Sequence, residues 1–185
     1  FVSVAAPSDD PYIDAGTVST TISSATGGGF EQLDVNPAAA VTSVTDDVDP
    51  TTVSLSATAS VAEGGSIVYT ATLTNAAQTP VTVTLSSGQT ITIAAGDSTG
   101  SVSILAPTDD VFVDAGSVSR TITAATGGNF ESLVVDATAA TTSVTDTIDT
   151  TTVSITGDAV VAEGATASYT VSLTSAAQTA VTVNL

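Results

Sequence analysis

The sequence contains no cysteine, histidine, methionine or tryptophan, and Arg120 is its single basic residue. Without cysteine and histidine the chain cannot form disulfides, zinc fingers, haem or iron–sulfur ligation, or the catalytic groups of Cys–His and Ser–His–Asp hydrolases. One cation against 19 acidic residues gives a formal net charge of −18. Because nucleic acid and anionic lipid repel such a surface, neither is expected as a partner.

Long hydrophobic runs are also absent, although the chain is not hydrophilic. Hydrophobic residues make up 42% of the 185 residues and the mean hydropathy is +0.42, values too high for an acidic disordered chain. No apolar run approaches the ~18 residues of a membrane span, so no direct membrane insertion is expected. Aliphatic residues alternate instead with Ser and Thr, a composition typical of half-buried strands. We therefore expect a folded chain rich in β-structure.

The chain repeats itself with a period near 100 residues. The segment DDPYIDAGTVSTTISSATGG at 9–28 returns at 109–128 as DDVFVDAGSVSRTITAATGG, and TTVSLSATASVAEG at 51–64 returns at 151–164 as TTVSITGDAVVAEG. About 50 of the 85 overlapping positions are identical. This period is the size of a domain and exceeds the ~20–50 residues of solenoid repeats, so each repeat is expected to have its own core.

The acidic stretches at 46–50 and 146–150 mark the predicted repeat boundaries. The predicted organisation is the C-terminal part of one repeat at 1–49, a complete repeat at 50–149 and the N-terminal part of the next at 150–185. We expect both ends to lie inside repeats of a longer array. Because the two partial repeats together lack only the counterpart of 86–100, they could complement each other between molecules.

Within the complete repeat, apolar residues alternate with a period of two, as in Ile67, Tyr69, Ala71 and Leu73. Turn signals separate such runs at 64–65, 86–88, 94–97, 107–110 and 126–128. Seven or eight short strands in roughly 100 residues predict tandem antiparallel immunoglobulin-like β-sandwiches, an all-β fold. Arg120 is expected at a sheet edge or end rather than in a site. The aromatic pairs that recur between repeats are expected in the core; they are Tyr12/Phe112, Phe30/Phe130 and Tyr69/Tyr169.

Acidic residues carry what chemistry the sequence offers. A DDxxxD group occurs in each repeat, and further acidic residues lie at each boundary and in each VAEG motif. One interpretation is that they are solvated turn residues, as expected for isolated Asp97, Asp136 and Asp158. For the DDxxxD groups and boundary pairs we favour a cation, because crowded carboxylates repel one another, and oxygen ligands in loops suit Ca²⁺ better than Mg²⁺ or transition metals. These groups are Asp9, Asp10 and Asp14; Asp109, Asp110 and Asp114; Asp46 and Asp49; and Asp146 and Asp149.

The order of these motifs resembles a known family. VAEG, a turn from Ile93 to Gly96, DDVFVD and a closing VTD resemble the Calx-β sandwich. The segments TTVSLSATASVAEGGSIVYTATLTNAAQTPVTVTL and TGGNFESLVV are similar to the tandem extender repeats of large repeats-in-toxin (RTX)-type biofilm adhesins. The resemblance covers essentially the whole chain. The glycine-rich nonapeptide calcium repeats of such adhesins are absent, and TGGGFE and TGGNFE are interpreted as turns.

The resemblance implies an extracellular, Ca²⁺-stiffened spacer on the bacterial cell surface that supports cell attachment and biofilm formation. It implies metal ligands at Glu63, Asp109, Asp110, Asp114 and Asp146, with Glu163 as the counterpart of Glu63 in the next repeat. The closing DTID at 146–149 departs from the family's unbroken acidic run, which leaves the number of ions per repeat open. Asp149 is a candidate ligand of a second ion shared with the neighbouring repeat.

Other functional classes stay open at this point. A β-sandwich module could bind carbohydrate or a protein, although such sites usually offer aromatic platforms. A subunit of a self-assembling extracellular filament or biofilm matrix is a variant of the extender. An enzyme is not expected, because the paired carboxylates recur in every repeat beside turns and have neither an aromatic substrate wall nor a cation. The expected partners are neighbouring repeats of the same chain.

Overall fold

The computed structural model describes residues 1–14 and 16–185, and every regular element in them is a β-strand. The prediction of an all-β chain is therefore confirmed. None of the described residues forms a helix long and apolar enough to cross a membrane. The chain divides into two compact units: the first comprises Phe1–Ala57, Val68–Ser103 and Ser119–Ala140, and the second comprises Thr58–Ile67, Ile104–Val118 and Thr141–Leu185.

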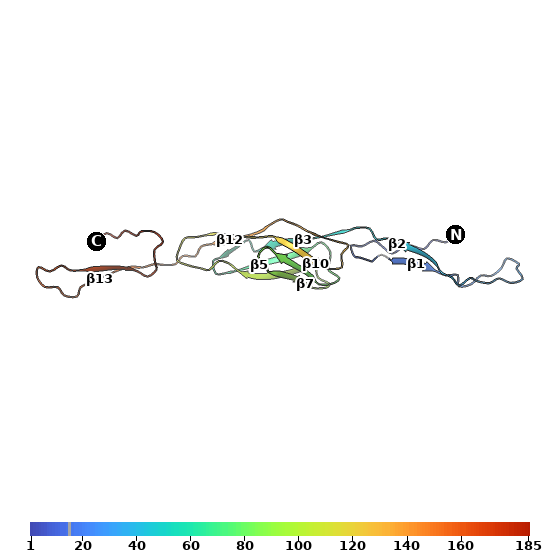
Figure 1. The fold of residues 1–185 in the computed structure, drawn as a ribbon, viewed down its shortest axis with the longest axis horizontal. Helices are drawn as coiled ribbons and strands as arrows, with labels where there is room; N and C mark the ends of the chain where they lie inside the picture. The colour runs from blue at the N-terminus through green and yellow to red at the C-terminus, as the bar shows by residue number, and fades with distance from the viewer. Residues whose placement is uncertain (15) are drawn as a thin grey trace. The chain divides into compact units, whose positions relative to one another are not determined.

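Three sheets lie mainly in the first unit (Figure 1). The smallest is an antiparallel pair, and the others have three and four strands. In spatial order they are β1 (Gly16–Thr20) and β2 (Ala40–Val44); β10 (Ile122–Gly127), β6 (Val81–Leu85) and β7 (Thr90–Ile93); and β11 (Ser132–Val135), β3 (Pro50–Ala57), β5 (Ser66–Leu73) and β8 (Thr99–Leu105).

Two sheets lie mainly in the second unit. One consists of β4 (Ser60–Ala62), β12 (Ala140–Thr145) and β9 (Gly116–Arg120), in that spatial order. The other is the antiparallel pair of β13 (Val153–Gly157) and β14 (Tyr169–Leu173). Arg120 is the last residue of β9, an outer strand, as the sequence predicts.

The period of two in the sequence becomes one buried and one exposed face on strands such as β6 and β7. On β6, Val81 and Val83 are fully buried while Thr82 between them is exposed. On β7, Ile91 and Ile93 are buried and Thr92 is exposed. Burial of such aliphatic side chains, about 1.5–3 kcal/mol each, stabilises the first unit. Its buried apolar residues are Val53, Tyr69, Ala71, Leu73, Ala77, Val81, Val83, Leu85, Ile91, Ile93, Ile122, Phe130 and Ala140.

The expectation of wholly antiparallel sheets is wrong at two strand pairs. β11 pairs with β3 in parallel, and β12 pairs with β4 in parallel. Parallel neighbours need a long crossover connection. Between β3 and β11 this connection contains the strands β4 to β10. Composition and periodicity predict where a strand lies and which of its faces is buried. They do not predict which strands far apart in the sequence pair with each other.

A loop of the preceding repeat packs on the complete repeat within the first unit. The ring of Tyr12 stacks on that of Phe130, with centroids 5.6 Å apart and planes at 23°. The Tyr12 hydroxyl donates a 2.6 Å hydrogen bond to the Ala76 carbonyl, and the Ile13 N–H donates to the Asn129 carbonyl at 3.2 Å. Stacked rings gain about 0.5–1.5 kcal/mol beyond their burial, so successive repeats meet at a defined contact.

The expectation that all recurring aromatic pairs are buried is wrong for the partial repeats. Tyr69 is 0% exposed, whereas its counterpart Tyr169 is 65% exposed; Phe130 is 6% exposed, whereas Phe30 is 67% exposed. Tyr69 lies on β5 between two neighbouring strands, but Tyr169 lies on β14, which pairs only with β13 in its sheet. The same residue type is therefore buried or exposed according to its neighbouring strands.

Position 128 requires glycine for two reasons, its positive φ and the lack of room for a Cβ. Gly128 has a φ of 88°, and a Cβ there would lie 2.2 Å from the Phe130 ring, whereas Gly88 has a φ of 86° and open space around it. Gly88→Ala should cost about 1–2 kcal/mol from the left-handed backbone alone. Gly128→Ala should cost clearly more, because the Phe130 ring must also move. Urea unfolding of both variants measures this difference, and equal losses of stability would contradict the clash.

Candidate metal centre

Glu63 is held in place by the strand that precedes it. It follows β4, whose parallel pairing with β12 sets Ala62 opposite Thr145. The Glu63 N–H continues this ladder by donating to the Thr145 carbonyl at 3.1 Å. The next residue, Gly64, turns the chain with a φ of 67° and donates its N–H to the Pro107 carbonyl at 2.6 Å. These backbone contacts place the Glu63 carboxylate in the second unit at 7% exposure.

Three carboxylates from separate segments of the second unit converge. Glu63 follows β4, Asp114 precedes β9, and Asp146 follows β12. Each offers a carboxylate oxygen, and these oxygens all lie within 4.8 Å of one another. Glu63 Oε2 and Asp146 Oδ1 are buried and have no hydrogen-bond partner among the residues that the structure describes. Buried carboxylate oxygens without a donor carry a desolvation cost, so this cluster, the acidic triad below, has the capacity to accept a cation.

The electrostatics of the acidic triad favour a proton when no cation is bound. The pKa of Glu63 is raised from its usual 4.5 to about 7. The hydrogen bond with Asp114 is the largest cause, followed by desolvation through burial and by repulsion from Asp114, Asp146 and Asp109. Glu63 therefore retains its proton at pH values below about 7 when no cation is bound. A cation bound to the same oxygens would replace it.

The other predicted ligands of this repeat are outside the acidic triad and make contacts of their own. Asp109 Oδ1 accepts a short hydrogen bond from the Thr147 hydroxyl. Asp110 Oδ1 accepts the N–H of Phe112 at 2.7 Å, a turn contact. Asp149 lines a small depression of about 100 Å³ with residues 111–113 and 146–148. Of these residues, Asp109 adds negative charge at Glu63.

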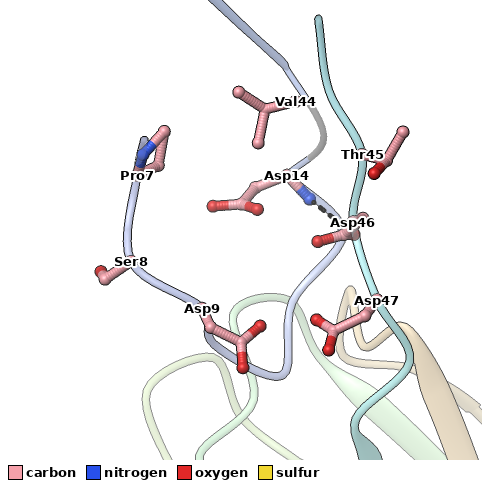
Figure 2. Close-up of a pocket in the computed structure, with 8 residues that line it drawn as sticks. All are labelled: Pro7, Ser8, Asp9, Asp14, Val44, Thr45, Asp46 and Asp47. Carbon is pink, nitrogen blue, oxygen red and sulfur yellow. Dashed lines mark hydrogen bonds between the residues drawn. The ribbon is translucent and has the colours of Figure 1, made fainter. Parts of the chain in front are cut away.

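A second acidic cluster occupies the equivalent place in the first unit. Asp9, Asp14, Asp46 and Asp47 line a hollow of about 300 Å³. Figure 2 shows these four side chains among the residues that line it. The Asp14 N–H donates to Asp46 Oδ2 at 3.4 Å. Burial is the main cause of the raised pKa of Asp14, with repulsion from Asp10 and Asp46 added. Asp14 and Asp46 are the counterparts of Asp114 and Asp146 in the acidic triad.

Asp9 differs from its counterpart Asp109 in the group it faces. Asp109 receives the hydroxyl of Thr147, whereas Asp9 faces the carboxyl of Asp47, which takes the place of that threonine. The hydrogen bond with Asp47 and then the repulsion from it raise the pKa of Asp9 to about 6. Burial and the charges of Asp49 and Glu131 raise it further. Asp10 instead accepts the Tyr12 N–H at 2.9 Å, as Asp110 does with Phe112.

Sequence reasoning missed Glu131. Its Oε2 accepts the Asp49 N–H at 2.6 Å, while its Oε1 is buried and has no hydrogen-bond partner in the described part of the chain. The hydrogen bond from Asp49 lowers the pKa of Glu131, but desolvation and the carboxylates of Asp46 and Asp49 outweigh it, so the pKa is raised. The available signal was an acidic residue after Gly-Gly-x-Phe in both repeats, at Glu31 and Glu131. Glu163, the predicted counterpart of Glu63, lies exposed beside the turn at Gly164.

Comparison with family models identifies the family to which this chain belongs. The family model of the LapA domain matches residues 1–47 and 49–147. The chain belongs to the LapA domain family. LapA is a large adhesin of biofilm formation, so this membership confirms the adhesin-related part of the predicted resemblance. No protein of curated function matches the chain.

The raised pKa of Glu63 makes stability depend on pH when cations are absent. Because the folded-state pKa of about 7 exceeds the usual 4.5, protonated Glu63 stabilises the fold at low pH, and this contribution is lost as the pH rises through 7. In EDTA, the temperature of the unfolding midpoint should therefore decrease as the pH is raised from 5 to 8. Glu63→Gln should flatten this fall and melt higher than the unmodified chain at pH 8.

Asp97→Asn provides the matched control, since it removes one negative charge from an exposed turn. It should leave the pH profile nearly unchanged. Circular dichroism melts at several pH values distinguish the variants. If Glu63→Gln and Asp97→Asn give the same profile, the proton on Glu63 is not what sets the pH dependence.

Proposed function

We propose that this LapA-family chain is a structural extender segment of a large cell-surface adhesin, built from tandem β-sandwich repeats and stiffened by Ca²⁺. In this role it acts outside the cell, as a spacer that supports cell attachment and biofilm formation. The acidic triad carries the proposal, and the family membership gives it context. The stacked contact of Tyr12 with Phe130 also suits a spacer, because it joins successive repeats directly.

The donor chemistry of the acidic triad supports a hard divalent cation. All three side chains present carboxylate oxygen, and the sequence has no imidazole or thiolate to attract a transition metal. The three ligands come from loops next to strands, so their spacing can adjust to the longer and more variable bonds of Ca²⁺. Glu63, Asp114 and Asp146 would hold the ion. Asp109 would add charge at the edge of the site.

Binding at this position would stiffen the repeat by joining segments that are far apart in its sequence. The acidic triad joins Glu63, near the start of the repeat, to Asp114 in its second half and Asp146 near its end, and these carboxylates otherwise repel. Extracellular modules bind Ca²⁺ at about 10⁻⁴–10⁻³ M, so they are loaded outside cells and empty inside. With a Kd of about 10⁻³ M, 10 mM Ca²⁺ would add about 1.4 kcal/mol to the free energy of unfolding.

The test is thermal unfolding in EDTA and across a Ca²⁺ titration, with Mg²⁺ as a second cation. We expect the midpoint to rise with Ca²⁺ by several degrees and to rise less with Mg²⁺. Asp114→Asn and Glu63→Gln should each remove most of the rise, because each loses one charged ligand of the acidic triad. Asp97→Asn removes an equal charge elsewhere and should keep the full rise.

Two outcomes would contradict the proposed site. If Ca²⁺ leaves the midpoint of the unmodified chain unchanged, the carboxylates are solvated turn residues and the spacer is not stiffened by a cation. If Asp97→Asn reduces the rise as much as Asp114→Asn does, the effect is general charge screening rather than binding at the acidic triad.

A further inference from the structure

The strands that open and close the complete repeat are parallel neighbours. β3 pairs in parallel with β11 over Pro50–Val53 and Ser132–Val135, and β4 pairs in parallel with β12 over Ser60–Ala62 and Ser143–Thr145. β3 and β4 are the first two strands of the repeat, and β11 and β12 are its last two. Each parallel pair therefore joins the segment by which the chain enters the repeat to the segment by which it leaves.

This parallel pairing determines how the hydrogen bonds between the strands meet tension along the chain. Tension on the N-terminal side pulls β3 and β4 toward their own N-termini, and tension on the C-terminal side pulls β11 and β12 toward their C-termini. Because the paired strands run in the same direction, these two pulls slide each strand along its neighbour. The evenly spaced hydrogen bonds of a parallel pair are then loaded together in shear, whereas a pair pulled apart from one end breaks them one at a time.

In the first unit, the pair of β3 and β11 is shielded from water on one face. Thr51 and Val53 of β3 are 0% exposed. Asp136, the residue after β11, donates its N–H to the Val53 carbonyl at 2.9 Å and continues the pairing beyond the strand. Hydrogen bonds in a low local dielectric are stronger than those that water reaches, so this pair is suited to hold under load.

In the second unit, further hydrogen bonds reinforce the pair of β4 and β12. The Thr142 hydroxyl donates to the Thr58 carbonyl at 2.7 Å, and the Ser143 N–H donates to the Ala59 carbonyl at 3.0 Å. Thr142 is 0% exposed, and Val144 on the same strand is 3% exposed. The entering and leaving segments are therefore bonded before β4 begins as well as along it.

We propose that the two parallel pairs act as a shear clamp, so that the complete repeat bears tension along the chain without a cation. The inference goes beyond the proposed function, because the clamp consists of the chain's own hydrogen bonds. The acidic triad lies directly after the second pair, since Glu63 follows β4 and Asp146 follows β12. Ca²⁺ at the acidic triad would add to the clamp, and only this addition rests on the proposed function.

The direction of pulling provides the test. The chain has no cysteine, so two introduced cysteines define the axis along which it is pulled. Val48→Cys with Ile148→Cys places one handle on each side of the repeat and loads both parallel pairs in shear. Ser66→Cys with Ile148→Cys places both handles beyond the C-terminal ends of β4 and β12, so this pair opens from one end. All three positions are exposed, so the handles leave the core intact.

Force ramps of the 185-residue chain in optical tweezers, in EDTA and at one loading rate, compare the two axes. We expect the complete repeat to unfold at a severalfold higher force along the shear axis than along the axis that opens β4 and β12 from one end. The released contour length identifies the unfolding of the complete repeat. Equal unfolding forces along the two axes would overturn the inference.

Two variants pulled along the shear axis separate the clamp from general stability. Thr142→Val removes the hydroxyl that bonds the Thr58 carbonyl and should lower the unfolding force. The control Ile91→Val removes a buried methylene under β7, an outer strand that belongs to neither parallel pair. It should lower the urea midpoint and leave the force unchanged, because forced unfolding is governed by the unfolding rate and β7 stays packed when the clamp breaks.

The two variants are compared at their measured losses of equilibrium stability. If Ile91→Val lowers the force as much as Thr142→Val does for the same loss, the force reports general stability and the clamp is wrong. The comparison of the two axes needs neither variant, so it decides the inference even if Thr142→Val does not fold.

Repeating both axes with Ca²⁺ distinguishes this inference from the proposed function. If the shear axis is stronger in EDTA but Ca²⁺ changes neither its force nor the thermal midpoint, the proposed function fails and the clamp stands. If Ca²⁺ raises the thermal midpoint while the two axes unfold at equal force in EDTA, the clamp is wrong and the cation site stands.

Discussion

Repulsion among carboxylates is the constraint to which the rest of this structure responds. The chain has 19 acidic residues and one basic residue, so it cannot neutralise its own clusters. Backbone and hydroxyl donors relieve some of the charge: the Thr138 side chain and N–H lower the pKa of Asp136. Protonation removes further negative charge, because the pKa values of Glu63 and Asp9 are raised to about 7 and about 6. A cation from solution is the remaining way to relieve an ionised cluster, which makes the stability of this fold sensitive to its ionic surroundings.

The two acidic clusters show how one substitution changes the chemistry of a conserved arrangement within the chain. Thr147 donates its hydroxyl to Asp109 whatever the pH, because a hydroxyl does not titrate in the physiological range. Asp47, in the equivalent place, can donate to Asp9 only while one of the two carboxyls keeps its proton. Repeats that look alike in sequence therefore differ in how strongly they retain protons. In an array of such repeats, the boundaries need not respond alike to pH or to cations.

The sequence contains most of the information about the strands and part of the information about the site. The period of two identifies the buried residues of β5, β6 and β7, and glycines with positive φ end the predicted runs at 64, 88 and 96. Glu63, Asp114 and Asp146 come together as three of the predicted ligands. Asp110 belongs to the same DDxxxD motif, but its carboxylate accepts the N–H of Phe112 in a turn instead of joining the acidic triad. Which of the two it does depends on the direction of the backbone. Glu131 escaped notice because its part in the second cluster arises only when Asp49 is folded against it.

Whether a residue in this chain is buried depends on strands from both halves of its repeat and not on its own segment alone. Tyr69 and Tyr169 occupy equivalent positions of their repeats, yet one is fully buried and the other 65% exposed. Tyr69 lies on a strand with a neighbour on each side, whereas the strand of Tyr169 pairs with β13 alone among the described residues. The pairs that close the complete repeat, β3 with β11 and β4 with β12, connect segments about 80 residues apart. Such contacts form only after both halves exist, so a repeat cannot be stabilised piece by piece as a solenoid is.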